Sequence, residues 1–319
     1  MAGHMTSSGE ENARGTADAQ ELASRLARGD AMRASVTPIL RHMLLHDDNA
    51  LFSDEIMARV HGFVWHIAVQ LLTAYARADG VADAEDYAAG NAEMLTEYLC
   101  ADEGLLGHLH ALALEARLSE RLGERGIVDP IVPPLVQGLV AAKEEAVAEM
   151  AMGLIAAQAR FLEQARRMEL PLAQLPADHF RKALDILKLC AGDAAAGSVA
   201  KASDKLRADY SEARSRLGLI SRLVTGLGQN ARAALTIDQS GAALFMTAIA
   251  MASRQSRDVI VMSCNDRRAS RLGLVLKAAG LKQRNVEAQF AYLEIDPALA
   301  EDFEAVSAAM AAQMIGGAG

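Results

Sequence analysis

The chain has 319 residues, of which 51% are hydrophobic but only 4% aromatic, and its formal net charge is −9. Its apolar residues are mostly Ala, Leu, Met and Val, which favours closely packed helices and argues against a sheet-rich fold. The three cysteines are far apart and form no C-x-x-C pair, so they predict neither a disulfide framework nor a zinc ribbon and fit a reducing, cytoplasmic environment. No apolar run reaches the roughly 20 residues that a membrane helix needs.

The N-terminal residues 1–16 are polar and show no periodicity, so we expect them to be disordered. Their first letters, MAGHM, are typical of a cloning remnant, and His4 is therefore not a candidate ligand. After this tail, the pattern predicts a short helix that ends at Gly29. A second helix is expected to begin at Pro38, with Thr37 as its N-cap.

The clearest helix of the chain is expected after Ser53. Asp54 and Glu55 suit its first turn, where acidic side chains interact favourably with the helix dipole. From Ile56 to Tyr75, apolar residues recur every three or four positions. Such a stripe predicts a helix with one face buried in a core.

Further amphipathic segments follow, and short turns with proline or glycine separate them. The pattern predicts an all-α fold of antiparallel helix pairs, either HEAT-like or an irregular helical array. Residues 17–190 and 205–319 would form two helical regions, with the Ala-, Gly- and Ser-rich stretch 191–204 as a candidate linker. The main helices are expected near 85–100, 102–122, 143–168, 177–190, 239–254, 257–265, 266–279, 283–293 and 298–313.

A seven-residue repeat runs from Leu206 to Leu227, with apolar residues at alternating spacings of four and three. This repeat predicts one helix with a coiled-coil-like seam. The seam can dock on the chain's own core, which we favour, or it can form a homodimer through residues 206–227.

Four histidines lie within residues 40–66, and His42 and His46 are the weak candidates for a metal site. A spacing of four places both on one helix face, where they could hold zinc or copper with ligands from elsewhere. The stretch has no H-E-x-x-H pattern and no E-x-x-H pair. Its other two histidines, five apart, point in different directions, and so do His108 and His110. We therefore predict no catalytic residue and no cofactor, and expect these rings to flank the core.

Charge is unevenly distributed along the chain. Residues 42–129 contain sixteen acidic residues and five arginines, whereas residues 254–284 contain eight basic residues and two aspartates. Such asymmetry either brings the two parts of the chain together or attracts an acidic partner. The candidate partner-binding residues are five arginines suited to carboxylates or phosphates, three of them expected on one helix: Arg254, Arg257, Arg267, Arg268 and Arg271.

The stretch from Ser240 to Phe290 resembles the closing region of a bacterial family called domain of unknown function 2336. In that family a Gly-small-Leu-Phe helix precedes a basic turn and a helix that ends in Ala-Ala-Gly-Leu, as GAALF and AAGL do here. MELPLAQLPADHF, residues 168–180, is similar to the family's middle segment. The resemblance implies an all-helical protein, often with HEAT-like helix pairs, and it implies no activity or catalytic residue.

Amphipathic helices without a catalytic constellation, together with segregated charge, favour a non-enzymatic interaction or adaptor protein of bacterial signalling or regulation. Its expected partner is another protein. Two alternatives stay open. One is a metal- or ligand-binding sensor or enzyme that uses the histidine-rich helices. The other is nucleic-acid binding by residues 254–284, although this segment has no aromatic residue to stack on bases and the chain is acidic.

Overall fold

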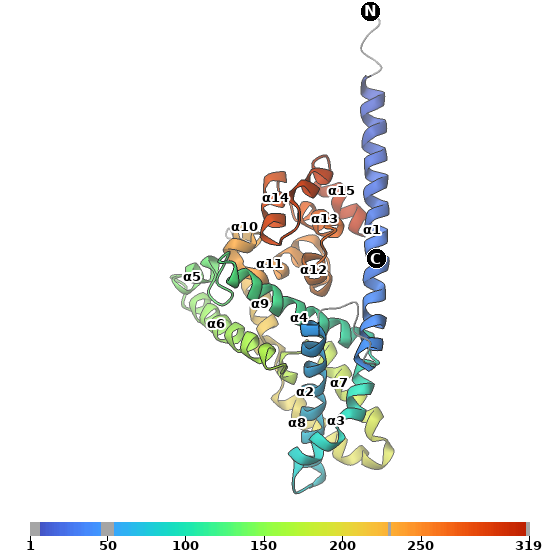
Figure 1. Ribbon diagram of the computed structural model, residues 1–319. Coiled ribbons are helices and arrows are strands. Elements are labelled where there is room, and N and C mark those ends of the chain that lie inside the picture. The colour runs from blue at the N-terminus through green and yellow to red at the C-terminus, as the bar shows by residue number, and fades with distance from the viewer. Residues whose placement is uncertain (1–6, 46–53, 229–230, 317–319) are drawn as a thin grey trace, which may run out of the picture.

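The computed structural model describes residues 7–45, 54–228 and 231–316, and within these ranges it contains helices and turns but no strand (Figure 1). This confirms the predicted all-α class. The α-helices are α1 Ser7–Leu45, α2 Asp54–Asp79, α3 Ala84–Cys100, α4 Glu103–Glu124, α5 Pro134–Val140, α6 Glu145–Arg166, α7 Ala177–Ala191, α8 Ala196–Asp209, α9 Arg216–Gly226, α10 Ala231–Ala234, α11 Ile237–Ser253, α12 Arg257–Cys264, α13 Ser270–Ala278, α14 Gln283–Tyr292 and α15 Ala308–Gly316. Short 3-10 helices are η1 Leu172–Gln174, η2 Asp193–Ala195, η3 Glu212–Arg214 and η5 Pro297–Phe303.

Helix α1 is continuous, whereas two helices were predicted, one ending at Gly29 and one beginning at Pro38. Leu22 and Leu26 pack among the C-terminal helices and Leu40 packs against the helices that follow α1. Contacts before Gly29 and after Pro38 thus override the weak helix preference of glycine and proline. Helix α1 begins at Ser7, within the segment that was expected to be disordered, and its first turns project beyond the rest of the molecule (Figure 1).

The predicted stripe on α2 is confirmed. Ile56, Phe63 and Leu71 are among its buried residues, and Tyr75 packs half-buried at its end. The stripe joins α3, α4 and α7 in a first hydrophobic cluster. Because a fully buried side chain of this size contributes about 1.5–3 kcal/mol, the stripe is a large part of what holds these helices together.

Helix α4 is shared between two clusters. Its first half packs with α2 and α3, whereas Leu118 and Leu122 in its second half pack with α11 to α15 and with Leu22 of α1. A third cluster joins α5, α6, α9 and α11. None of the described helices has the length and apolarity needed to cross a bilayer.

The predicted helix over residues 206–227 is interrupted. Helix α8 ends at Asp209, and α9 begins only at Arg216 after a turn. Ser215 caps α9 by accepting a hydrogen bond from the Gly218 amide at 3.1 Å, and a Cβ at Gly218 would lie 2.1 Å from the Glu212 carbonyl oxygen. The capping serine and the glycine therefore explain the break, which the repeat alone does not reveal.

Most apolar residues of the repeat face the chain's own interior, and Ala213 is exposed. Ile220 and Leu227 are buried in the third cluster, beside α6 and α11. The candidate linker 191–204 contains η2 and most of α8, and Val199 and Ala202 of α8 are buried. In the described residues the repeat and this segment are thus part of the packed fold.

Candidate functional site

Three residues on one face of α2 hold the chain that follows α6. Gly62, His66 and Gln70 are each four residues apart, so they lie in a row. A Cβ at Gly62 would lie 2.3 Å from the Met168 Cβ and 2.7 Å from its carbonyl oxygen. Only glycine therefore allows the turn at Met168 to approach α2 this closely.

His66 and Gln70 of the same row form hydrogen bonds with the backbone of Leu170 and Leu172, which follow Met168. The Leu170 amide donates a hydrogen bond to Nδ1 of His66 at 3.0 Å. Gln70 donates from Nε2 to the Leu170 carbonyl oxygen at 2.9 Å, and its Oε1 accepts from the Leu172 amide at 3.0 Å. These bonds satisfy the backbone of a non-helical segment, so Leu170–Leu172 has a defined position on α2.

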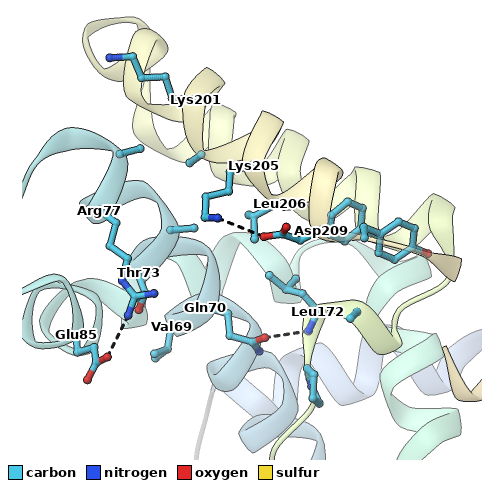
Figure 2. A pocket seen from close by; sticks show the side chains of 17 residues that line it. Val69, Gln70, Thr73, Arg77, Glu85, Leu172, Lys201, Lys205, Leu206 and Asp209 are labelled. Carbon is cyan, nitrogen blue, oxygen red and sulfur yellow. Dashed lines mark hydrogen bonds and ion pairs between the residues drawn. The ribbon is translucent and has the colours of Figure 1, made fainter. Parts of the chain in front are cut away.

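This segment is the floor of a groove of about 790 Å³ between α2 and α8, which we call the α2–α8 groove (Figure 2). On each wall helix, the lining residues come in adjacent pairs that recur every four positions, as expected for one exposed face. The lining comes from five parts of the chain: Val69, Gln70, Thr73, Ala74, Arg77 and Ala78 from α2, Glu85 from α3, Pro171, Leu172 and Ala173 from the floor, Phe180 from α7, and Lys201, Ala202, Lys205, Leu206, Asp209 and Tyr210 from α8 and its end.

Aromatic rings close one part of the groove. Phe180 and Tyr210 stack with ring centroids 4.1 Å apart and planes at 10°. The Tyr210 hydroxyl donates to the Leu175 carbonyl oxygen at 2.9 Å. Burial, with the nearby charge of Glu212, raises the pKa of Tyr210 to about 12, so the hydroxyl stays neutral and donates.

Most charges at the rim of the groove neutralise one another. Arg77 pairs with Glu85 at 3.2 Å, and Lys205 pairs with Asp209 at 3.5 Å (Figure 2). Lys201 makes no ion pair with any described residue. The groove therefore has a largely apolar lining, and the Lys201 ammonium on its α8 side is a positive charge without a counter-charge among the described residues.

Arg257, a predicted partner-binding residue, is an internal residue. Both of its terminal nitrogens donate to the Glu115 carboxylate, at 2.7 and 2.9 Å, and its Nε donates to Thr247 at 2.9 Å. Arg216 binds the same carboxylate at 2.7 and 3.0 Å, and its guanidinium lies 3.7 Å from the centre of the Phe161 ring. Burial alone would raise the pKa of Glu115, but the two guanidinium groups lower it far below its usual range.

Arg271 is likewise engaged within the chain. It is 7% exposed, donates from Nε to Asp30 of α1 at 2.8 Å, pairs with the other Asp30 oxygen through Nη2, and donates to Gln255 at 2.9 Å. Helix α13 begins at Ser270 and not near residue 266, so Arg267 and Arg268 lie in the preceding turn, where both are exposed. Arg254, exposed at the end of α11, completes the set of exposed predicted arginines.

The histidines divide into several environments. His46 lies outside the described residues, as does the side chain of His42, so that weak metal candidate stays a prediction. His61 is exposed. His110 is 5% exposed, and burial lowers its pKa to about 4. His108 contacts Asp258 and His179 from two other helices, a combination that spacing along the chain does not indicate.

Comparisons with models of known families, with curated proteins and with solved structures find no significant match. The resemblance to domain of unknown function 2336 therefore stays a prediction. The α2–α8 groove and the exposed arginines are the features on which a functional proposal can be built.

Proposed function

We propose that this chain is a binding protein whose α2–α8 groove holds an amphipathic molecule with an apolar body and one anionic head group. A volume of about 790 Å³ suits a small molecule. The apolar floor and walls favour a hydrocarbon body, because burying each CH₂ contributes about 0.8 kcal/mol. Lys201 favours an anionic head group because it has no ion-pair partner among the described residues.

A fatty acid of medium length is a defined probe for this site. We expect dodecanoate to bind with a Kd on the order of millimolar or somewhat tighter, because burial of about ten CH₂ groups contributes roughly 8 kcal/mol and association costs about 4 kcal/mol or more. Isothermal titration calorimetry measures this affinity directly. Dodecanol, which lacks the charge, is expected to bind more weakly.

Two substitutions test the position of the probe. Ala74→Trp fills the groove and should weaken dodecanoate binding by more than tenfold. Lys201→Glu should weaken binding of dodecanoate more than that of dodecanol. The matched controls are Leu189→Trp and Lys188→Glu, at exposed positions of α7 outside the groove lining. Dodecanoate affinity that is equal in wild type and Ala74→Trp would refute the proposed site.

We also propose that the chain is a non-enzymatic adaptor that binds an acidic partner protein through its exposed arginines. Arg28, Arg254, Arg267 and Arg268 make no ion pair with any described residue. A cleft of about 450 Å³ at the start of α13 is lined by Arg25, Arg28, Arg268, Ser270 and Leu299. Because guanidinium groups bind carboxylates in a bidentate manner, this surface suits Asp- and Glu-rich segments.

Charge reversal at Arg254, Arg267 and Arg268 tests the adaptor proposal. Arg271 and Arg257 stay unchanged, because their loss would disturb the fold. We expect the variant to fold normally and to lose a nuclease-resistant protein partner in pull-downs from the native host's lysate, read by mass spectrometry. The matched control reverses three exposed cations of α6 and α7: Arg160, Arg181 and Lys188. Equal capture by both variants would argue against the adaptor surface, and capture lost on nuclease treatment would favour nucleic acid.

A further inference from the structure

Two histidines and one aspartate meet where α4, α7 and α12 come together. His108 lies within α4, His179 in the first turn of α7 and Asp258 in the first turn of α12. One donor atom from each of the three side chains lies within 4.8 Å of the other two. Nδ1 of His108 is 2.9 Å from Oδ2 of Asp258. Three helices that are far apart in sequence thus supply a compact set of nitrogen and oxygen donors.

The hydrogen bonds of the fold do not use all the polar atoms of this set. His108 is 3% exposed, and its Nε2 has no hydrogen-bond partner among the described residues. The ring of His179 stacks on that of His108, with centroids 4.7 Å apart and planes at 16°. A buried ring nitrogen without a partner is costly, so the fold leaves part of the His108 ring unsatisfied while its other nitrogen, Nδ1, faces Asp258.

An ion can reach the cluster from solvent. The side chain of Asp258 is 32% exposed, whereas that of His108 is 4% exposed, and His179 is half-buried. The neighbouring Asp102 is already engaged, because it accepts from the Leu105 amide at 2.8 Å and pairs with Lys182 at 2.9 Å. The available donors are therefore the two imidazoles and the Asp258 carboxylate.

We propose that His108, His179 and Asp258 form a binding site for a divalent transition-metal cation of the Zn²⁺ type. Imidazole and carboxylate donors suit Zn²⁺, and the lack of a thiolate argues against a site for Cu(I). Three protein ligands leave a fourth position of a tetrahedral ion for water or a bound molecule.

Binding requires one side chain to move. A metal ion lies close to the plane of each imidazole that binds it, and the two stacked planes are nearly parallel. His179 must therefore turn out of the stack, which its half-exposed position allows. The bound ion would then tie α7 of the first hydrophobic cluster to α12 of the second. Because it binds the folded state, it should raise the thermal unfolding temperature.

The test is titration of chelator-stripped full chain with Zn²⁺ alone, in competition with a chromogenic chelator. We expect one equivalent to bind, and we expect Co²⁺ to give the strong visible absorption of a tetrahedral ion. His179→Ala and Asp258→Asn should each weaken Zn²⁺ binding by at least about tenfold, since even indirect supporting residues of metal sites have effects of this size. Asp258→Asn keeps a hydrogen-bond acceptor for His108, so the fold should persist, as circular dichroism can verify.

Two controls separate this site from other histidines. His61→Ala removes an exposed histidine of α2 and should leave Zn²⁺ affinity unchanged. The double variant His42→Ala, His46→Ala should also bind as wild type does. Absence of stoichiometric binding, unchanged affinity in both His179→Ala and Asp258→Asn, or loss confined to the His42, His46 double variant would each overturn the proposal.

Discussion

Glu115 is a fully buried carboxylate that binds two guanidinium groups. It is 0% exposed, and Arg216 and Arg257 approach it from α9 and α12. Charges are expensive to bury, and a buried arrangement of this kind is acceptable only when nearly every donor has a partner. Here Gln158 and Thr247 accept further bonds from the two arginines. Glu115 thus joins α4, α9 and α12 where the three helices meet.

Replacement of Glu115 by Gln should lower the free energy of unfolding by about 3–5 kcal/mol, because two buried cations lose their counter-charge. Urea unfolding followed by circular dichroism measures the change. Glu163→Gln is the matched control, because Glu163 forms an exposed pair with Arg167 and such pairs contribute about 0–1 kcal/mol. Equal losses in the two variants would contradict the assigned role of Glu115.

The stability that Glu115 contributes should depend on pH. Its pKa is lower in the folded chain than the ordinary value of 4.5, so the unfolded chain binds a proton first as the pH falls. The contribution is therefore fully present above pH 4.5 and is lost progressively below it. We expect the difference in unfolding free energy between wild type and Glu115→Gln to shrink as the pH falls below this value. A difference that stays constant down to pH 3 would count against the ionised cluster.

At the scale of elements, the row of Gly62, His66 and Gln70 shows how one helix face positions a non-helical segment. The glycine allows close approach, and the two polar side chains satisfy the backbone of Leu170 and Leu172. The floor of the α2–α8 groove thus depends on residues that do not all line it.

Gly62→Ala should destabilise the protein by about 1–3 kcal/mol, because the added methyl group collides with the backbone at Met168. Gly90→Ala on α3 is the matched control. Gly90 is exposed and has no atom within 4 Å of an added Cβ, so this change should stabilise the helix by about 0.5–1 kcal/mol. Chemical unfolding of both variants measures the two effects, and effects of the same sign would contradict the packing described here.

The sequence predicts helices well where one face is strongly apolar, as on α2. It predicts them poorly where contacts with residues far away along the chain determine where a helix begins or ends. Pro38 continues α1 because the helix is packed both before Gly29 and after Pro38, and the break before Arg216 depends on a close approach at Gly218. Neither candidate ligand site was predicted, because each combines segments separated by many residues. A row of Gly, His and Gln four apart on α2 is the one local pattern that could have indicated the groove floor.

At the scale of the whole molecule, the uneven charge has one of its two expected consequences, attraction within the chain, and the attraction of an acidic partner stays a prediction. Arg257 and Arg271 bind Glu115 and Asp30 and so join the basic segment to α4 and α1. Arg267 and Arg268, by contrast, stay exposed. Internal attraction and an outward basic surface are therefore properties of the same segment.

Asp30→Asn should loosen α1 without unfolding the rest, because it weakens charged hydrogen bonds worth about 1.5–3 kcal/mol to Arg271. Hydrogen exchange by mass spectrometry should show amides of residues 20–40 exchanging about tenfold faster or more. Asp204→Asn, which affects an exposed pair with Arg207 on α8, is the matched control. Unchanged exchange in Asp30→Asn would show that apolar contacts alone hold α1.

The shared core of α1 and the C-terminal helices also bears on how the chain folds during synthesis. Leu22 and Leu26 belong to the same hydrophobic cluster as Phe290 and Phe303, which are more than 260 residues away along the chain. On the ribosome, this cluster cannot be completed until the chain has emerged as far as these phenylalanines. The leucines of α1 therefore lack part of their final packing while the intervening helices are made.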